Sequence, residues 1–229
     1  MRILIAGVNQ GLGLVLSRLL AENGHEVYAC YRNKPSGAVL EFAERFARFK
    51  MVELDVTSEL MAAAASEKIS GDGGKLDAVV VTAGILTDSD REFLITDAVI
   101  DDLRAALEVN VVGSAIMIKH FHRLIKDGGM FITVTSEAGS MTNIGAKYPG
   151  YSISKAAQNK LTAILAKTAV HCRVYAVHPG RMNTAMGKND AQIEPEEAAE
   201  GICRILSGEK KIPPEHGWFI DYRGDAMEI

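Results

Sequence analysis

A tyrosine, a lysine and a serine of this sequence could together move a proton. Tyr151 and Lys155 are four residues apart, a spacing that puts both side chains on one face of an α-helix. A free phenol titrates near ~10, but beside a fixed ammonium group in a partly desolvated pocket it can exchange a proton at neutral pH. The spacing alone is a weak indication, since such pairs are common on helix surfaces. The hypothesis therefore depends on Ser136, fifteen residues upstream, and on the elements that would bring these groups together.

The composition predicts one globular domain over residues 1–229. The chain has 229 residues, of which 48% are hydrophobic and 24% charged, enough for one large core. A net charge of −4 without a basic run argues against nucleic acid as a partner. The opening apolar run is too short for a signal peptide or a membrane span, so we expect a cytoplasmic protein with no membrane contact. Three cysteines without C-x-x-C spacing favour reduced thiols, and we expect no metal.

The first turn of the chain predicts nucleotide binding. An apolar run over 2–6 is followed by Gly-Val-Asn-Gln-Gly-Leu-Gly over 7–13, and then by a helical apolar rhythm that ends at Gly24. Glycines at a strand-to-helix junction leave room for a pyrophosphate, and the first amides of the helix point at it. A tight turn that only packs the helix on the strand is the alternative. The predicted contacts in this turn are Gly7, Asn9, Gln10, Gly11 and Leu12.

The rest of the chain predicts a doubly wound sheet. About seven apolar strands alternate with six helical segments, which indicates an α/β Rossmann-type parallel sheet with helices on both faces. Such sheets bind ligands at the carboxyl ends of their strands. Beyond the glycine turn, these ends carry Arg32, then Asp55 and Val56, then Ala83 and Gly84, then Ser136, and finally Pro179 and Gly180.

Two of these strand-end residues, and one residue within a helical stretch, have specific implications. Arg32 stands where an arginine meets the 2′-phosphate of NADP, and Tyr31 occupies the place of the acid that would favour NAD. A solvated basic turn is the alternative for Arg32. Asn110 interrupts a long helical stretch over 98–125 with a residue that disfavours helix interiors, so we expect a break or kink there. Asp55 could instead cap the helix that follows it, a task that Thr57 could share.

Taken in order, these motifs resemble the short-chain dehydrogenase/reductase family over nearly the whole chain. The stretch over 178–187 and the ending over 217–222 are similar, more narrowly, to the sniffer-type carbonyl reductases and their bacterial C-factor relatives. The family matches are Gly7, Gly11 and Gly13 in the turn, the pair Asp55 and Val56, Asn110 with Gly113, Ser136, Tyr151 with Lys155, and Pro179 and Gly180 with Thr184.

Three departures from the family pattern affect the nucleotide site. Thr82 stands in a stretch where the family usually has two asparagines, so their hydrogen bonds to the backbone must come from elsewhere. Ala6 replaces the usual threonine before Gly7. Neither Asn9 nor Gln10 is basic, so the preference for NADP rests mostly on Arg32.

The resemblance implies hydride transfer between a nicotinamide cofactor and a carbonyl or alcohol substrate, with NADP(H) preferred over NAD(H). Tyr151 would give its proton to the carbonyl oxygen, and Ser136 would hydrogen-bond that oxygen. Lys155 would hold the nicotinamide ribose and lower the pKa of Tyr151, while Asn110 would hold a water molecule in a proton relay. Thr184 would contact the nicotinamide end. Family members are commonly homodimers or homotetramers, and we expect the same of this chain.

Two other functions are compatible with the fold. A binding or signalling protein could keep the nucleotide site as a sensor, although it would not need the proton-donating phenol of Tyr151. An epimerase or dehydratase of the extended relatives is disfavoured by the short C-terminal part.

The substrate side of the site is expected to be open. Only ten residues separate Thr184 from Pro195, too few for the helical lid that the wider family usually carries. Broad tolerance among carbonyl substrates with weak binding would follow. The few apolar contacts should come from Ile85, Leu86, Met141, Ile144 and Met186.

Overall fold

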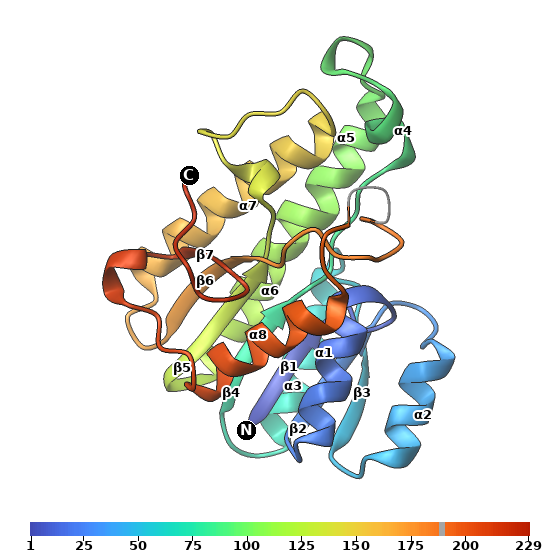
Figure 1. Cartoon of the computed structure of the whole chain (residues 1–229). Helices are drawn as coiled ribbons and strands as arrows, with labels where there is room; N and C mark the ends of the chain where they lie inside the picture. Colours follow the sequence, from blue (N-terminus) through green and yellow to red (C-terminus); the bar gives the residue numbers. More distant parts are fainter. Residues whose placement is uncertain (188–190) are drawn as a thin grey trace.

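The structure, a computed structural model, describes residues 1–187 and 191–229. Within these residues seven parallel strands form one sheet in the order β3-β2-β1-β4-β5-β6-β7 (Figure 1). The strand order reverses between β1 and β4, and such a switch point opens a crevice at the carboxyl ends of the strands. The predicted doubly wound α/β fold is confirmed. The strands are β1 (Arg2–Ala6), β2 (Glu26–Tyr31), β3 (Phe49–Glu53), β4 (Leu76–Val81), β5 (Ile125–Val134), β6 (Arg173–His178) and β7 (Phe219–Asp221).

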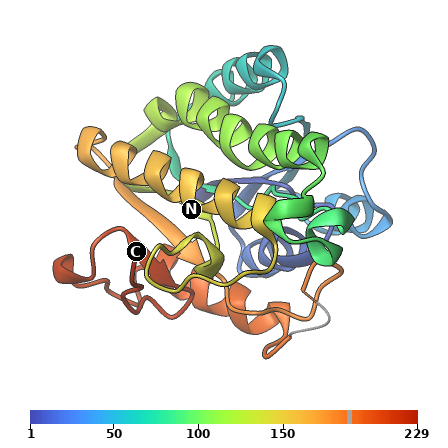
Figure 2. The same ribbon diagram turned by 90° about the horizontal axis from the view of Figure 1, so that it is seen from above.

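Helices cover both faces of the sheet (Figures 1 and 2). One face packs against α1 (Gly11–Glu22), α2 (Gly37–Arg45) and α8 (Pro195–Ser207). The other packs against α3 (Glu59–Gly71), α6 (Gly113–Phe121) and α7 (Pro149–Thr168), with α5 (Ile100–Leu107) lying against α7. A short helix α4 (Asp88–Glu92) and the turns η1 (Ile95–Asp97), η3 (His122–Leu124), η4 (Glu137–Gly139) and η5 (Pro214–His216) complete the connections.

Burial on both faces explains why the strands are continuous apolar runs. In β1, Ile3 and Ile5 point into the core beneath α1, whereas Leu4 and Ala6 point into the core beneath α3 and α6. All four residues are fully buried. A parallel strand covered on both sides has no wet face, so the alternation of apolar and polar residues disappears.

The break expected near Asn110 is confirmed. Between α5 and α6 the chain forms one turn of π-helix, η2 (Glu108–Val112), and Asn110 lies at its centre, fully buried. Gly113 follows because a Cβ there would lie 2.8 Å from Cγ2 of Val56. The bulge brings Asn110 beside the carboxyl end of β4, where its side chain hydrogen-bonds the backbone of Ile85.

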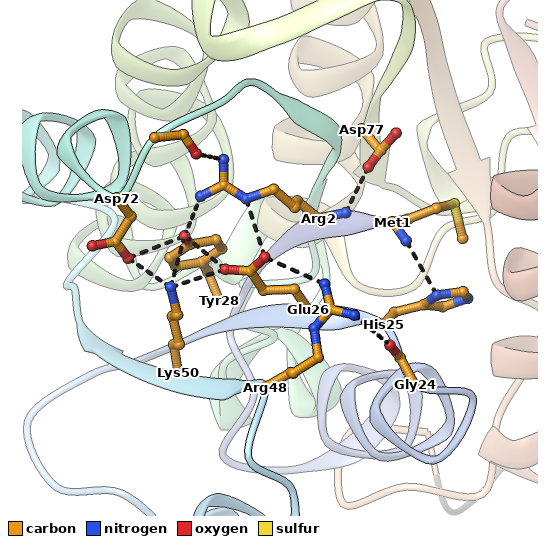
Figure 3. Close-up of polar contacts among 11 residues, drawn as sticks. Met1, Arg2, Gly24, His25, Glu26, Tyr28, Arg48, Lys50, Asp72 and Asp77 are labelled. Atoms are coloured by element: carbon orange, nitrogen blue, oxygen red, sulfur yellow. Dashed lines mark hydrogen bonds and ion pairs between the residues drawn. The ribbon is translucent and has the colours of Figure 1, made fainter.

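A polar network joins the amino ends of the first three strands (Figure 3). Arg2 Nε lies 3.2 Å from Glu26, and Lys50 Nζ lies 2.9 Å from both Glu26 and Asp72. The hydroxyl of Tyr28 accepts a hydrogen bond from Arg2 at its centre. Burial alone would raise the pKa of Glu26, but hydrogen bonds from Lys50 and Tyr28 and the charge of Arg2 leave it below its usual value. These charges hold the strands together at the edge opposite the predicted ligand edge.

Local details differ from the sequence expectations in two places. Asp55 does not cap α3, since its Oδ1 accepts hydrogen bonds from the amide and hydroxyl of Thr57, and Ser58 caps the helix by accepting from the Met61 amide. The loop expected over 85–96 contains α4 and η1. In the described parts of the chain, no helix combines the length and apolar character needed to cross a membrane.

Candidate active site

The glycine turn after β1 is built for close backbone approach. Gly7 has φ of +104°, and a Cβ there would lie 2.8 Å from the amide nitrogen of Ala83. A Cβ on Gly13 would overlap the carbonyl oxygen of Gly7. Gly11, with φ of +57°, faces Thr184 across the turn. Side chains at these positions would push α1 away from β1 and β4, so the turn leaves its backbone open to a ligand.

The amino end of α1 has no neutralising side chain. Gln10 is the N-cap residue but makes no side-chain cap, and the first turn of α1 contains no acid. The free amides and the positive end of the helix dipole therefore remain available to an anion. A dinucleotide pyrophosphate fits this position.

Thr82 supplies the backbone hydrogen bonds that the missing asparagines were expected to make. Its hydroxyl donates to the carbonyl oxygen of Ala6 at 2.8 Å, and the oxygen of Gly7 is 3.0 Å away. One hydroxyl thus ties the end of β4 to the turn after β1.

The glycine turn also holds in place the loop that carries Arg32. Asn9 donates to the carbonyl oxygen of Lys34 and accepts from the amide of Ser36, both at 3.0 Å, so it fastens the loop after β2. Arg32 on this loop is exposed and lines the cavity. Within residues 1–187 and 191–229 it has no hydrogen bond or ion pair, so its guanidinium is available to a ligand.

The tyrosine and the lysine lie on α7, as their spacing predicts. The helix begins after Tyr148, which has φ of +59° and makes no side-chain cap. The buried carboxylate of Asp90, on α4, caps the helix instead by accepting from the amides of Gly150 at 2.9 Å and Tyr151 at 2.5 Å. Asp90 therefore positions the first turn of α7, which carries Tyr151.

Lys155 is only 3% exposed and lies 5.5 Å from the centre of the Tyr151 ring. Its ammonium donates to the carbonyl oxygen of Val134 at 3.0 Å and to Oε1 of Gln158 at 2.8 Å. Burial lowers the pKa of Lys155 to about 7 because neither partner carries a negative charge.

The pKa of Tyr151 moves opposite to our expectation. Burial raises it to about 12, against a smaller lowering by the Ser136 hydroxyl beside it. The expected lowering by Lys155 is absent because the ammonium is directed at Val134 and Gln158, not at the phenol oxygen. In the protein alone, burial thus favours the neutral forms of both groups.

A buried chain of hydrogen bonds connects Lys155 to the π-helix. Gln158 accepts from Lys155 and donates through Nε2 to the hydroxyl of Ser114 at 2.8 Å. Ser114 in turn donates to the carbonyl oxygen of Asn110 at 2.8 Å. The Asn110 amide also donates to the hydroxyl of Ser154. Side chains therefore couple the lysine to the helical bulge, and a relay water held by Asn110 stays a prediction.

These elements enclose a cavity of 1020 Å³ at the carboxyl edge of the sheet, large enough for a dinucleotide together with a small substrate. All the predicted cofactor contacts line it, as do Ser136, Tyr151 and Lys155, whereas Asn110 lies behind the wall. Met141 and Ile144 do not line it; they are 65% and 75% exposed because their loop turns them toward water. Among the described residues, no cluster of histidine, cysteine and carboxylate groups is arranged to hold a metal ion.

One hydrogen bond links the two sides of the cavity near the expected substrate position. Arg91, on α4, donates through Nη2 to the carbonyl oxygen of Met186 at 2.7 Å. This contact joins α4 to the segment that follows β6, and both residues line the cavity. Residues 188–190 of the short loop lie outside the described residues, so the openness of this side stays a prediction.

The burial of Lys155 makes the stability of the cofactor-free protein depend on pH. Its pKa is about 7 in the folded protein and 10.5 for a lysine in water, so between these values the unfolded chain takes up a proton that the folded protein does not bind. The free energy of unfolding should therefore rise with pH across this window, by up to ~1.4 kcal/mol per pH unit. Urea unfolding at pH 7, 8 and 9 measures it, with Lys155→Met as the control that should lack this slope. Equal slopes for both proteins would contradict the burial of a titrating lysine.

A doubly wound sheet with this turn and cavity defines a dinucleotide-binding protein of the Rossmann type. Residues 7–204 match the family model described as enoyl-(acyl carrier protein) reductase. A Rhodococcus sp. (strain AD45) protein named 1-hydroxy-2-glutathionyl-2-methyl-3-butene dehydrogenase is 30% identical over 237 residues, covering 99% of this chain and 98% of the relative. The chain belongs to the short-chain dehydrogenase/reductase family of oxidoreductases.

Solved structures share the fold over the whole length of the chain. Carbonyl reductase Sniffer of D. melanogaster has a TM-score of 0.89 at 23% identity, covering 100% of this chain and 99% of that chain. A short chain dehydrogenase from Burkholderia cenocepacia J2315 in complex with NADP has a TM-score of 0.78 at 23% identity, covering 98% of this chain and 97% of that chain. The family resemblance predicted from the motifs is confirmed.

Proposed function

We propose that this protein is an NADP(H)-dependent carbonyl reductase that uses Tyr151 as its general acid and base. The observation that carries the proposal is the convergence of Ser136, Tyr151 and Lys155 on the wall of one cavity that begins at the glycine turn. A pure nucleotide sensor would need the turn but not the phenol. The similar D. melanogaster protein is a carbonyl reductase and the Rhodococcus relative is named a dehydrogenase of a hydroxy compound, and these two names describe the two directions of one type of reaction.

The residues of the cavity fit a dinucleotide in a defined orientation. The turn over 7–13 and the free amides of α1 would hold the pyrophosphate, and Arg32 would meet a 2′-phosphate. Ala83 and Gly84 are small residues beside the position expected for the nicotinamide ring. A Cβ on Gly84 would lie 3.4 Å from Lys155 Nζ. Lys155 would reach the ribose next to the nicotinamide, and Thr184 would contact its far end. When bound, the nicotinamide supplies or accepts the hydride.

The protein's own part is to move a proton and hold the substrate oxygen. Tyr151 donates its phenolic proton to the carbonyl oxygen, and the Ser136 hydroxyl hydrogen-bonds the same oxygen and sets its position. The raised pKa of Tyr151, about 12, keeps the phenol protonated and ready to donate at neutral pH. When Lys155 carries its proton, its positive charge stabilises the phenolate that remains after Tyr151 has donated.

A homodimer or homotetramer is part of this proposal. Val112, Ile153 and Ile164 are 41%, 43% and 53% exposed on η2 and α7, helices that form one outer face of the molecule. Exposed apolar side chains on these helices favour pairing with a second copy.

Oxidation of NADPH and of NADH against aldehydes, ketones and quinones of increasing bulk tests the proposal. We expect turnover with several carbonyls and a preference for NADPH. A protein that binds NADPH tightly yet reduces none of them would favour the sensor function instead.

A further inference from the structure

The cavity is basic although the whole chain is acidic. The net charge of the chain is −4. The described residues that line the cavity include five basic side chains and two carboxylates: Arg32, Arg91, Lys147, Lys155 and Arg181 against Asp55 and Glu137. Such an excess of one charge raises the local concentration of ligands of the opposite charge.

Three of these basic side chains have partners or roles that account for them. Arg181 lies 2.6 Å from Glu137, and Lys155 is already bound to Val134 and Gln158. Arg32 lies at the end of the cavity expected to take the adenosine phosphate. Arg91 and Lys147 remain, and both lie at the other end of the cavity.

Arg91 lines the same cavity as the reacting groups and is joined to their elements through its neighbours. Its neighbour Asp90 accepts from the amide of Tyr151 at 2.5 Å, and its own Nη2 donates to Met186, two residues after Thr184. Arg91 therefore lies between the amino end of α7 and the segment expected to contact the nicotinamide end. Lys147 is exposed in the loop that leads into α7.

The guanidinium of Arg91 has unused capacity. Its side chain is 23% exposed, and the carbonyl oxygen of Met186 is the one hydrogen-bond acceptor it has among residues 1–187 and 191–229. The carboxylate of Asp88 is 3.9 Å from its Nε and fully exposed to water. Asp90 is directed at two backbone amides instead. A guanidinium carries five N–H groups, and a mostly buried one gains most from an anion that accepts two of them.

We propose that the substrate is a carbonyl compound that carries a carboxylate, and that Arg91 binds this carboxylate while Tyr151 and Ser136 face the carbonyl oxygen. The inference rests on the proposed reductase function and specifies its substrate class. Arg91 then determines specificity through substrate binding and leaves the chemical step unchanged.

Matched aldehydes test the proposal: 4-formylbenzoate, which is anionic, and its neutral methyl ester. In Arg91→Gln, which keeps a donor for Met186 but loses the charge, the ratio of kcat/KM for the anion over the ester should fall about 10- to 100-fold, as expected for loss of a charge-assisted hydrogen bond. The change should lie in KM. Arg91→Lys should retain most of the preference, and Arg104→Met, which changes an exposed cation on α5 outside the cavity, should leave the ratio unaltered.

A binding experiment separates this proposal from the proposed activity. Saturation-transfer NMR with 4-methylbenzoate, which has no carbonyl to reduce, should show binding that Arg91→Gln weakens at least tenfold. If no aldehyde is reduced by any variant, the proposed function is wrong, yet this binding still tests Arg91. If Arg91→Gln affects both aldehydes equally or leaves the binding of 4-methylbenzoate unchanged, Arg91 is only a contact between α4 and Met186, and the proposal is overturned.

Discussion

Tyr151→Phe should abolish carbonyl reduction while leaving cofactor affinity nearly intact. The substitution removes one hydroxyl and keeps the ring that packs against the cavity wall near Lys155. Without the phenolic proton, the substrate oxygen has no general acid, and such groups contribute about 10²- to 10⁴-fold to rate. We expect kcat to fall by at least this amount, with the NADPH dissociation constant changed less than a few-fold. Single-turnover kinetics and fluorescence titration of NADPH measure the two quantities.

A second tyrosine provides the matched control for this result. Tyr175 lies on β6 in the core outside the cavity, so Tyr175→Phe removes a phenolic hydroxyl from the same fold without touching the site. Its activity should match that of the unaltered protein. Substantial reductase activity in Tyr151→Phe, comparable with this control, would show that another group donates the proton.

Arg32→Asp should reverse the cofactor preference. The guanidinium of Arg32 is exposed at the cavity and unpaired among the residues that the structure describes. A charge-assisted hydrogen bond to a 2′-phosphate is worth about 1.5–3 kcal/mol, and an aspartate would repel the phosphate but accept from a free ribose hydroxyl. The ratio of NADPH to NADH affinity should therefore fall by about 10- to 150-fold. Titration of both cofactors measures the ratio directly.

The same change two residues away distinguishes a specific contact from a general charge effect. Lys34 lies on the same loop but does not line the cavity, so Lys34→Asp should alter the ratio much less. Equal effects of the two substitutions would mean that Arg32 is only a solvated turn residue. In that case the hydrogen bonds from Asn9 to this loop would stabilise the fold and have no role in cofactor binding.

Contacts between residues far apart in the sequence position several groups of the site. Asp90 caps α7 from 60 residues away and Arg91 reaches Met186 across 95 residues, so no local pattern indicates either contact. Gln158 is a residue of the site that was not predicted from the sequence, although its position gives a weak indication. It is a polar residue three positions after Lys155, on the same helix face, and such a residue in a buried stripe needs a partner. That partner, Ser114, is 44 residues away.

The sequence by itself determined the sheet, the glycine turn, the helical break at Asn110 and the placing of Tyr151 and Lys155 on one helix. Each of these follows from residue types at short spacing, where backbone geometry leaves few choices. Tertiary structure decided the rest, including the hydrogen bonds of the Thr82 hydroxyl to the turn after β1 and the exposure of Met141 and Ile144 to water. It also decided the pKa of Lys155, which is lowered to about 7, and that of Tyr151, which is raised to about 12. Burial and partner identity set these properties, and both arise only when segments distant in the chain pack together.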